Sequence, residues 1–165
     1  MSFPSRHLLV LLLAGWLAVP APARLGETLA DLKKRFDSPA TQIRKDSTNA
    51  TWLFDQDDTG QLAYTVTFNA KGHSIAEGLK PVKRARFSNE TAQDFIEQQL
   101  APYHDSKTQQ ILKPGEKYRF AGQIFICGKE EYVVVDEPRG LLLIWSKVVD
   151  PAVMVVSPEM FRKGN

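Results

Sequence analysis

The sequence predicts an α+β fold, in which a short helix is followed by antiparallel strands, with two main helices and about six to eight strands. Apolar residues recur at helical spacing in two short segments, residues 29–36 and 89–100. Strict alternation of apolar and polar residues, rich in β-branched and aromatic side chains, marks residues 62–68 as a half-buried strand. Runs of consecutive apolar residues near the C-terminus, at 124–127 and 141–145, are typical of strands covered on both faces.

Residues 1–23 have the three parts of a secretory signal. Arg6 supplies the positive charge, residues 8–19 form an uncharged apolar stretch, and Ala21 and Ala23 lie at the −3 and −1 positions of a cleavage site. The apolar stretch is shorter than the ~20 residues that a membrane-spanning helix needs. We therefore expect cleavage after Ala23 and an exported protein, periplasmic or secreted, with an uncleaved anchor as the alternative.

Cleavage leaves residues 24–165 as a single exported α+β domain, long enough to bury one core. Removing Arg6 leaves 20 basic against 19 acidic residues, a net charge of +1, which gives no electrostatic case for a nucleic-acid partner. Cys127 is the one cysteine of the sequence, so no intrachain disulfide can form. The mature chain has no second apolar run of membrane length, so we expect membrane contact to be peripheral at most.

The first helix should begin at Thr28, which is a good N-cap and has an acid, Asp31, at the capping-box position. Its apolar stripe extends to Phe36, and the Asp-Ser-Pro of residues 37–39 ends it. A strand-like run at 52–55, the strand at 62–68, a turn at 69–72 and a strand around 74–79 follow.

In the strand at 62–68, the large apolar side chains share one face and should pack under the helices. The other face offers the small side chains Ala63, Thr65 and Thr67, and the two threonine hydroxyls cost little to desolvate when a partner supplies hydrogen bonds. With the neighbouring Lys83 and Arg84, Thr65 and Thr67 form the candidate partner surface.

Ser88 should cap the second helix, residues 89–100, and Pro102 should end it. Residues 103–115 show no period and read as a loop. Four β-rich segments follow, with a terminal helical turn after Ser157: residues 117–127 (one or two strands), 131–136, 141–149 and 152–156.

The two helix starts resemble each other, because Glu-Thr-x-x-Asp at residue 27 recurs 63 positions later at residue 90. One reading is a duplication, with pseudo-repeats at 24–87 and 88–165. The other is that capping chemistry favours similar residues at any helix start.

Residues 24–79 show a familiar order: a helix opened by Gly-x-Thr and closed by Phe-x-x-Pro, an aromatic strand, a turn, and an alternating strand that ends in Phe and a Gly turn. The residues that carry it are Gly26, Thr28, Phe36, Pro39, Trp52, Phe54, Tyr64, Val66, Phe68 and Gly72. The order resembles the small outer-membrane lipoproteins of the SmpA/OmlA (BamE) type and is similar to the repeat of the β-lactamase-inhibitor proteins. The resemblance implies an extracytoplasmic interaction module of helix-plus-antiparallel-sheet fold. It does not carry over lipid anchoring, because the expected mature N-terminus is Arg24 and not cysteine.

Two patterns are compatible with chemistry. Cys127 with His73 or His104 would give a thiol nucleophile and its base, but a cysteine after an apolar strand is more often a core residue. The Asp-rich segment 55–60 resembles the start of a calcium loop, yet Thr59 and Val66 stand where the motif needs Asp and Glu, so a hairpin loop is favoured.

The basic segment 80–86 fits either anionic partners or the protection of an exposed edge strand, and we favour protection. Asn49 and Asn89 begin glycosylation sequons, to which we assign no function. No catalytic, cofactor-binding or metal-binding motif is predicted.

The sequence therefore favours a non-enzymatic exported interaction or adaptor module with a protein partner in the cell envelope. The alternatives are a secreted enzyme inhibitor that acts through its sheet face and, less favoured, a small thiol hydrolase that uses Cys127.

Overall fold

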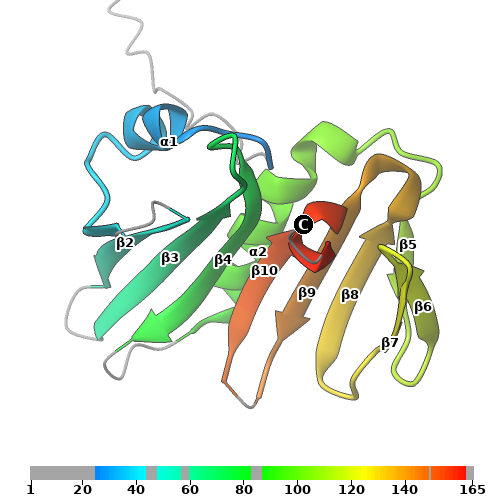
Figure 1. Cartoon of the computed structure of the whole chain (residues 1–165). Helices are drawn as coiled ribbons and strands as arrows, with labels where there is room; N and C mark the ends of the chain where they lie inside the picture. Colours follow the sequence, from blue (N-terminus) through cyan, green and yellow to red (C-terminus); the bar gives the residue numbers. More distant parts are fainter. Residues whose placement is uncertain (1–24, 44–47, 57–59, 83–86, 149, 163–165) are drawn as a thin grey trace, which may run out of the picture.

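The computed structural model describes residues 25–43, 48–56, 60–82, 87–148 and 150–162. The predicted signal segment, Lys83 and Arg84 lie outside these ranges. The described residues form two α-helices and ten strands in antiparallel sheets, which confirms the α+β class (Figure 1). The helices are α1 (Leu29–Arg35) and α2 (Asn89–Leu100), and the strands are β1 (Gln42–Ile43), β2 (Asn49–Gln56), β3 (Gly60–Phe68), β4 (Ser74–Val82), β5 (Gln110–Leu112), β6 (Lys117–Phe120), β7 (Gln123–Ile126), β8 (Glu131–Asp136), β9 (Leu141–Ser146) and β10 (Ala152–Val156). Three 3-10 turns complete the described elements: η2 (Ala101–Tyr103), η3 (Glu137–Arg139) and η4 (Pro158–Phe161).

Eight of the described strands form one sheet in the order β1-β2-β3-β4-β10-β9-β8-β5, and β6 pairs with β7 in a separate hairpin. From either edge to the centre, the strands follow chain order: β1 to β4 from one side, and β5, β8, β9 and β10 from the other. Two repeats joined through their last strands would give this order, with the β6–β7 hairpin inserted in the second.

The similar residues at the two helix starts are not equivalent in space. Thr28 is the N-cap of α1, where its hydroxyl accepts from the Asp31 N–H and the Asp31 carboxylate closes the capping box, as predicted. In α2 the N-cap is Ser88, also as predicted, and Thr91 is the third helical residue. The two occurrences of Glu-Thr-x-x-Asp therefore hold different positions relative to their helix starts, and both readings of the recurrence stay open.

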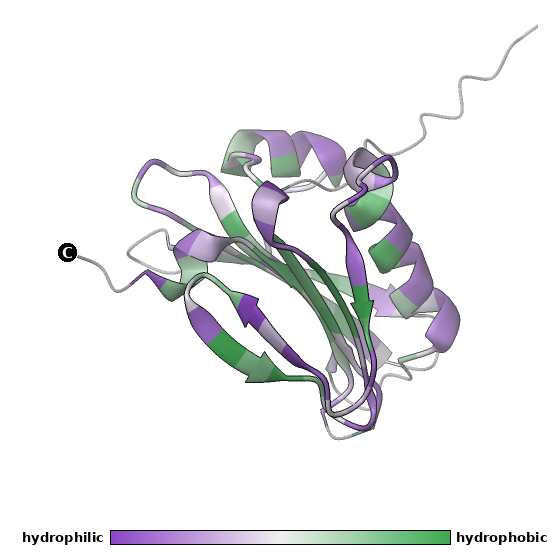
Figure 2. Ribbon diagram, turned by 90° about the vertical axis from the view of Figure 1, so that its right-hand side faces the viewer, coloured by the Kyte–Doolittle hydropathy of each residue, from purple (hydrophilic) through white to green (hydrophobic). Residues whose placement is uncertain are grey.

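Both helices cover the same face of the sheet. Leu32 of α1 and Phe95 of α2 are buried in one apolar cluster with the predicted inward face of β3 and with side chains from β9 and β10. The other face is covered over β8, β9 and β10 by the β6–β7 hairpin and η4, through a second cluster that includes Phe120 and Leu142. Figure 2 shows the sheet between the helices on one side and the hairpin on the other.

Three expectations need correction. The predicted loop 103–115 contains β5, a three-residue edge strand on β8, because its backbone pairs with Val133–Val135 although its side chains show no clear period. Ile124 and Ile126 are 65% and 62% exposed instead of buried, because only one side of the hairpin packs on the sheet. Lys80, Pro81 and Val82 of the basic segment lie in β4, a central strand and not an edge, and the rest of the segment lies outside the described residues.

The consecutive apolar run of β9 behaves as predicted. Leu141, Leu142 and Leu143 are fully buried, because the helices cover one face of this strand and the hairpin covers the other. Ser106 and Thr108, in the predicted loop, donate hydroxyl hydrogen bonds to the buried Asp136 carboxylate and so hold the loop against the end of β8.

The inward face of β3 can be tested by deleting a core side chain. We expect Phe68→Ala to lower the free energy of unfolding by ~3–5 kcal/mol, because it leaves a cavity between β3 and the helices. Ile124→Ala, which truncates an exposed side chain on the hairpin, should change it by less than about 0.5 kcal/mol. Urea denaturation of both variants measures the difference, and equal effects would contradict this arrangement of the core.

Candidate functional site

On the face of the sheet opposite the helices, the described elements leave β2, β3 and most of β4 bare, because the hairpin and η4 pack over β8, β9 and β10 and extend onto β4 at Ala76 (Figure 1). Register partners on neighbouring strands point to the same face. One row on this face runs from the bare strands into the covered half and consists of Thr51, Thr65, Gly78, Met154 and Ile144.

Thr65 and Thr67 lie on the bare face, as the alternation in β3 predicted. Ala63 lies on the same face of β3 but is buried. Both threonine hydroxyls already have side-chain partners. Thr65 Oγ1 lies 3.3 Å from Thr51 Oγ1, and Thr67 Oγ1 donates to Asn49 Oδ1 at 2.9 Å. Since a hydroxyl has one donor and two acceptor positions, each can still bond to a partner.

A groove of about 240 Å³ lies on this face where β3 and β4 meet β10 and η4. We call it the threonine groove, and its main lining residues are Thr65, Thr67, Gly78, Met154 and Met160. Gly78 has no side chain to fill the groove, and a Cβ there would meet only ordinary contacts at 3.4 Å and beyond. The two methionines are 42% and 45% exposed. Flexible thioether side chains are common on surfaces that adapt to a partner.

Charge near the groove comes from Lys80, an exposed residue of β4 that also lines it. Lys83 and Arg84, the other half of the predicted partner surface, lie outside the described residues, as do Asp57 and Asp58 of the calcium-like segment. Asp55 of that segment is exposed and accepts from Gln61 Nε2 at 2.8 Å. Within the described ranges, no group of three His, Cys, Asp or Glu side chains is placed to hold a metal ion.

Cys127 is 2% exposed and packs in the second apolar cluster with Tyr118 and Phe120. Burial raises the pKa of its thiol, and Glu131 and Glu116 raise it further. The two histidines considered as bases form hydrogen bonds with other groups. His73 Nδ1 lies 2.8 Å from the Gly26 carbonyl oxygen, and His104 Nδ1 lies 2.8 Å from the Ala101 carbonyl oxygen. The surroundings of Cys127 thus disfavour a reactive thiolate.

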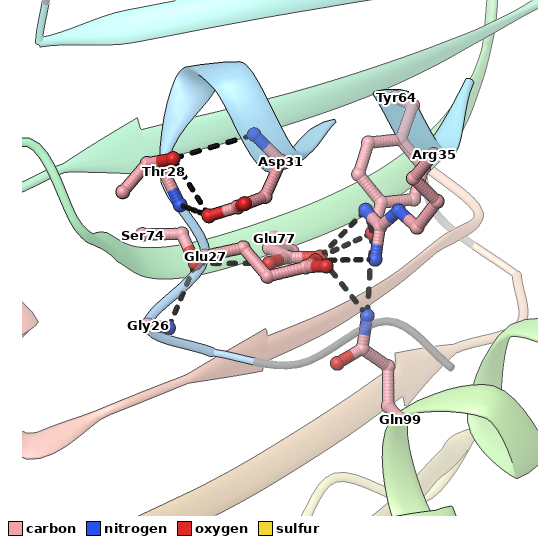
Figure 3. Close-up of polar contacts among 9 residues, drawn as sticks. All are labelled: Gly26, Glu27, Thr28, Asp31, Arg35, Tyr64, Ser74, Glu77 and Gln99. Carbon is pink, nitrogen blue, oxygen red and sulfur yellow. Dashed lines mark hydrogen bonds and ion pairs between the residues drawn. The ribbon is translucent and has the colours of Figure 1, made fainter. Parts of the chain in front are cut away.

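Polar side chains missed by the sequence analysis gather beneath the helices (Figure 3). This buried polar cluster consists of Arg35 from α1, Tyr64 from β3, Glu77 from β4 and Gln99 from α2. Arg35 Nη2 lies 2.9 Å from Tyr64 Oη and 3.3 Å from Glu77 Oε2. Gln99 Nε2 donates to Glu77 Oε2 at 3.1 Å, and the Tyr64 hydroxyl donates to the same oxygen.

The cluster is closed to solvent, since the Arg35 side chain is 4% exposed and that of Glu77 is fully buried. Arg35 Nη1 also forms an ion pair with Glu27 Oε2 at 2.7 Å, and its guanidinium carbon lies 4.6 Å from the centre of the Phe36 ring. Burial lowers the pKa of Arg35, but Tyr64, Glu77 and Glu27 together raise it by more. Burial, followed by the charge of Glu77, raises the pKa of Tyr64 well above its ordinary range, so this phenol stays protonated.

The same cluster fixes the start of the described chain. Ser74 Oγ donates to Glu77 Oε1 at 3.0 Å and accepts from the Gly26 N–H at 2.9 Å. The Ser74 N–H donates to the Glu27 carbonyl oxygen at 2.8 Å. Hydrogen bonds thus run from residues 26–27 through β4 to both helices, and we assign the cluster a structural role.

Each missed feature had a weak signal in the sequence. Glu77 stands at an inward position of the alternating run 74–79, where a carboxylate must be paired if it is buried. Gly78 interrupts the same run, and glycine inside a strand often marks close approach of another group. Neither signal names a partner, because Arg35, Gln99 and Met154 come from distant segments.

Removing the acid of the buried polar cluster tests its role. We expect Glu77→Ala to lower the free energy of unfolding by ~3–5 kcal/mol, because Arg35 remains buried with less compensation for its charge. The double variant Arg35→Met with Glu77→Leu should be more stable than Glu77→Ala, because no uncompensated charge remains.

The matched control is Glu97→Ala, which removes an exposed acid from α2 and should change stability by less than about 0.5 kcal/mol. Chemical denaturation of the four proteins gives the comparison. A loss of under about 1 kcal/mol for Glu77→Ala would contradict the burial of Arg35 with Glu77 as its compensating charge.

No helix among the described residues is long and apolar enough to cross a membrane. Comparison with protein-family models, curated proteins and solved structures gives no match for this chain. Its function is therefore inferred from its own residues and geometry.

Proposed function

We propose that this protein is an exported, non-enzymatic interaction module that binds a protein partner of the cell envelope through the threonine groove. The observation that carries the proposal is the bare half of the sheet, where a mostly apolar groove lies open between hydroxyl-bearing and methionine side chains. Solvent-exposed apolar surface of this kind is typical of interaction sites.

The chemistry of the groove indicates what the partner presents. Gly78 and the methionines accept an apolar side chain, whereas Thr65 and Thr67 offer hydrogen bonds at one side of it. Lys80 adds a positive charge, which favours an acidic residue beside the apolar one. We therefore propose a partner segment with an apolar anchor and a neighbouring carboxylate.

Two further observations support an extracytoplasmic role. Residues 1–23 have the pattern of a secretory signal, and residues 24–79 resemble the SmpA/OmlA (BamE) type of outer-membrane lipoprotein, which implies an interaction module. The proposal does not extend to lipid anchoring or to a role in outer-membrane assembly. The alternative function, a secreted enzyme inhibitor, differs in that its partner is an enzyme, so identification of the partner distinguishes the two.

Export makes a prediction about the N-terminus. Mass spectrometry of the protein from the envelope or medium should show a chain that begins at Arg24, because the small residues before it form the cleavage site. A chain that retains Met1 and sediments with membranes would instead mean that the apolar segment is an anchor.

The groove makes a second prediction. Thr65→Arg should weaken partner binding about tenfold or more, because the long side chain then fills the groove and excludes the apolar anchor of the partner. Its melting temperature should stay close to that of the parent, since this face is half-exposed. Cross-linking in intact cells, followed by affinity purification, identifies the partner, and titration with the purified partner measures the loss.

Ile111→Arg is the matched control, because it places the same side chain on an exposed position of β5, on the face that carries the helices. It should leave partner binding unchanged. If Ile111→Arg weakens binding as much as Thr65→Arg, the groove is not the site. If Thr65→Arg unfolds the protein, the bare face is core and the proposal fails.

A further inference from the structure

A second hollow lies at one end of the sheet, where three segments far apart in the sequence meet. The β3–β4 turn, the η3 turn before β9, and η4 lie at the same end in Figure 1. They line a cleft of about 590 Å³, within the usual size of small-molecule sites. Four exposed basic side chains reach it, and we call it the basic cleft: Lys71, His73, Arg139 and Arg162.

Side-chain contacts hold these segments in place. Asn69 Oδ1 accepts from the backbone N–H groups of Lys71 at 3.0 Å and His73 at 3.1 Å, which shapes the β3–β4 turn. Asn69 Nδ2 donates to Glu159 Oε2 at 2.7 Å and so ties this turn to η4.

The turn before β9 is held against η4 as well. Gly140 has a left-handed backbone, with φ of +70°, and a Cβ there would lie 3.2 Å from Pro158 Cδ. The backbone that carries the basic side chains is thus preorganised in the structure without a ligand.

The charges of the basic cleft are not balanced from within. Lys71, Arg139 and Arg162 form no ion pair with the described residues. Glu159 is the acid that lines the cleft, and its carboxylate is bound to Asn69. Among the lining residues, three permanent positive charges therefore face one negative charge, and Arg139 also interacts with the carboxylate of Asp136 outside the lining.

One neutral group adds hydrogen-bonding capacity, and it is not His73. His73 Nδ1 donates to the Gly26 carbonyl oxygen, because a carbonyl can only accept, so Nε2 of this neutral tautomer is an acceptor and offers no hydrogen to a phosphate oxygen. Ser157 is a lining residue of the same cleft, and its buried Oγ has no hydrogen-bond partner among the described residues. A buried hydroxyl without a partner is costly, and a ligand oxygen would satisfy it.

We propose that the basic cleft binds a ligand that carries a phosphate group. A phosphate has up to two negative charges and several acceptor oxygens, which suits cations mounted on three separate segments together with a hydroxyl. A carboxylate, which is planar and singly charged, would use fewer of these donors. The cleft exceeds one phosphate in volume, so the phosphate belongs to a larger molecule, either a soluble phosphate ester or a lipid headgroup. The proposal goes beyond the partner-binding function and uses none of the five residues that define the threonine groove.

The first arm of the test titrates the purified protein with inorganic phosphate and with glycerol phosphate in chloride buffer, followed by calorimetry or NMR. We expect saturable binding that weakens about tenfold in Arg139→Gln and in Arg162→Gln, because each variant removes charge-assisted hydrogen bonds. Arg119→Gln, which removes an exposed cation from the β6–β7 hairpin, is the matched control and should bind as the parent does.

The second arm identifies the source of the phosphate by sedimentation with vesicles. Retention on phosphatidylcholine vesicles that contain phosphatidic acid, lost in Arg139→Gln but not in Arg119→Gln, assigns a lipid headgroup. Phosphate binding without retention assigns a soluble ester. Ser157→Ala, which keeps every charge, should also weaken phosphate binding, and it provides the test if an arginine variant fails to fold.

The proposal is overturned if phosphate does not bind saturably in the millimolar range. It is also overturned if Arg119→Gln weakens binding as much as Arg139→Gln, because the effect would then follow net charge alone. Thr65→Arg should leave phosphate binding unchanged, so failure of the basic cleft and failure of the threonine groove give different results.

Discussion

The antiparallel pairing of β4 with β10 joins the two halves of the sheet, and both candidate sites depend on it. The pairing sets Met154 beside Gly78 and Val156 beside Ala76, residues that are almost half the chain apart. It therefore brings together Gly78 and Met154, two lining residues of the threonine groove. Because η4 follows β10 directly, the same pairing carries η4 to the β3–β4 turn, where Asn69 binds Glu159 and the basic cleft forms.

The two faces of the sheet are covered in different ways, and this difference leaves one surface open. Two helices and a buried polar cluster cover one face, which leaves Phe68 and Trp52 almost without solvent contact. The β6–β7 hairpin and η4 cover the other face over β8, β9 and β10 and reach β4 at Ala76. A sheet this wide needs more cover than one short hairpin gives, so the face over β2, β3 and most of β4 stays bare.

The buried polar cluster explains how two helices of modest apolar content are held in position. A buried arginine and glutamate stabilise little by themselves, because desolvation offsets most of their attraction. Their hydrogen bonds to Tyr64, Gln99 and Ser74, however, are made in only one arrangement of α1, α2 and β4. The cluster therefore specifies how the helices sit on the sheet more than it adds stability.

Local features of this chain were determined by the sequence alone. The Thr28 and Ser88 caps, the two helices, and the alternation that separates Phe68 from Thr67 each depend on residues within about a dozen positions, where periodicity and capping act. Only the tertiary structure decided which strands pair, that β4 is central, and that Arg35 meets Glu77 and Gln99. The physical reason is that an alternating pattern determines which face of a strand is buried but not which strand lies beside it. The groove, the cleft and the polar cluster are all made by such neighbours.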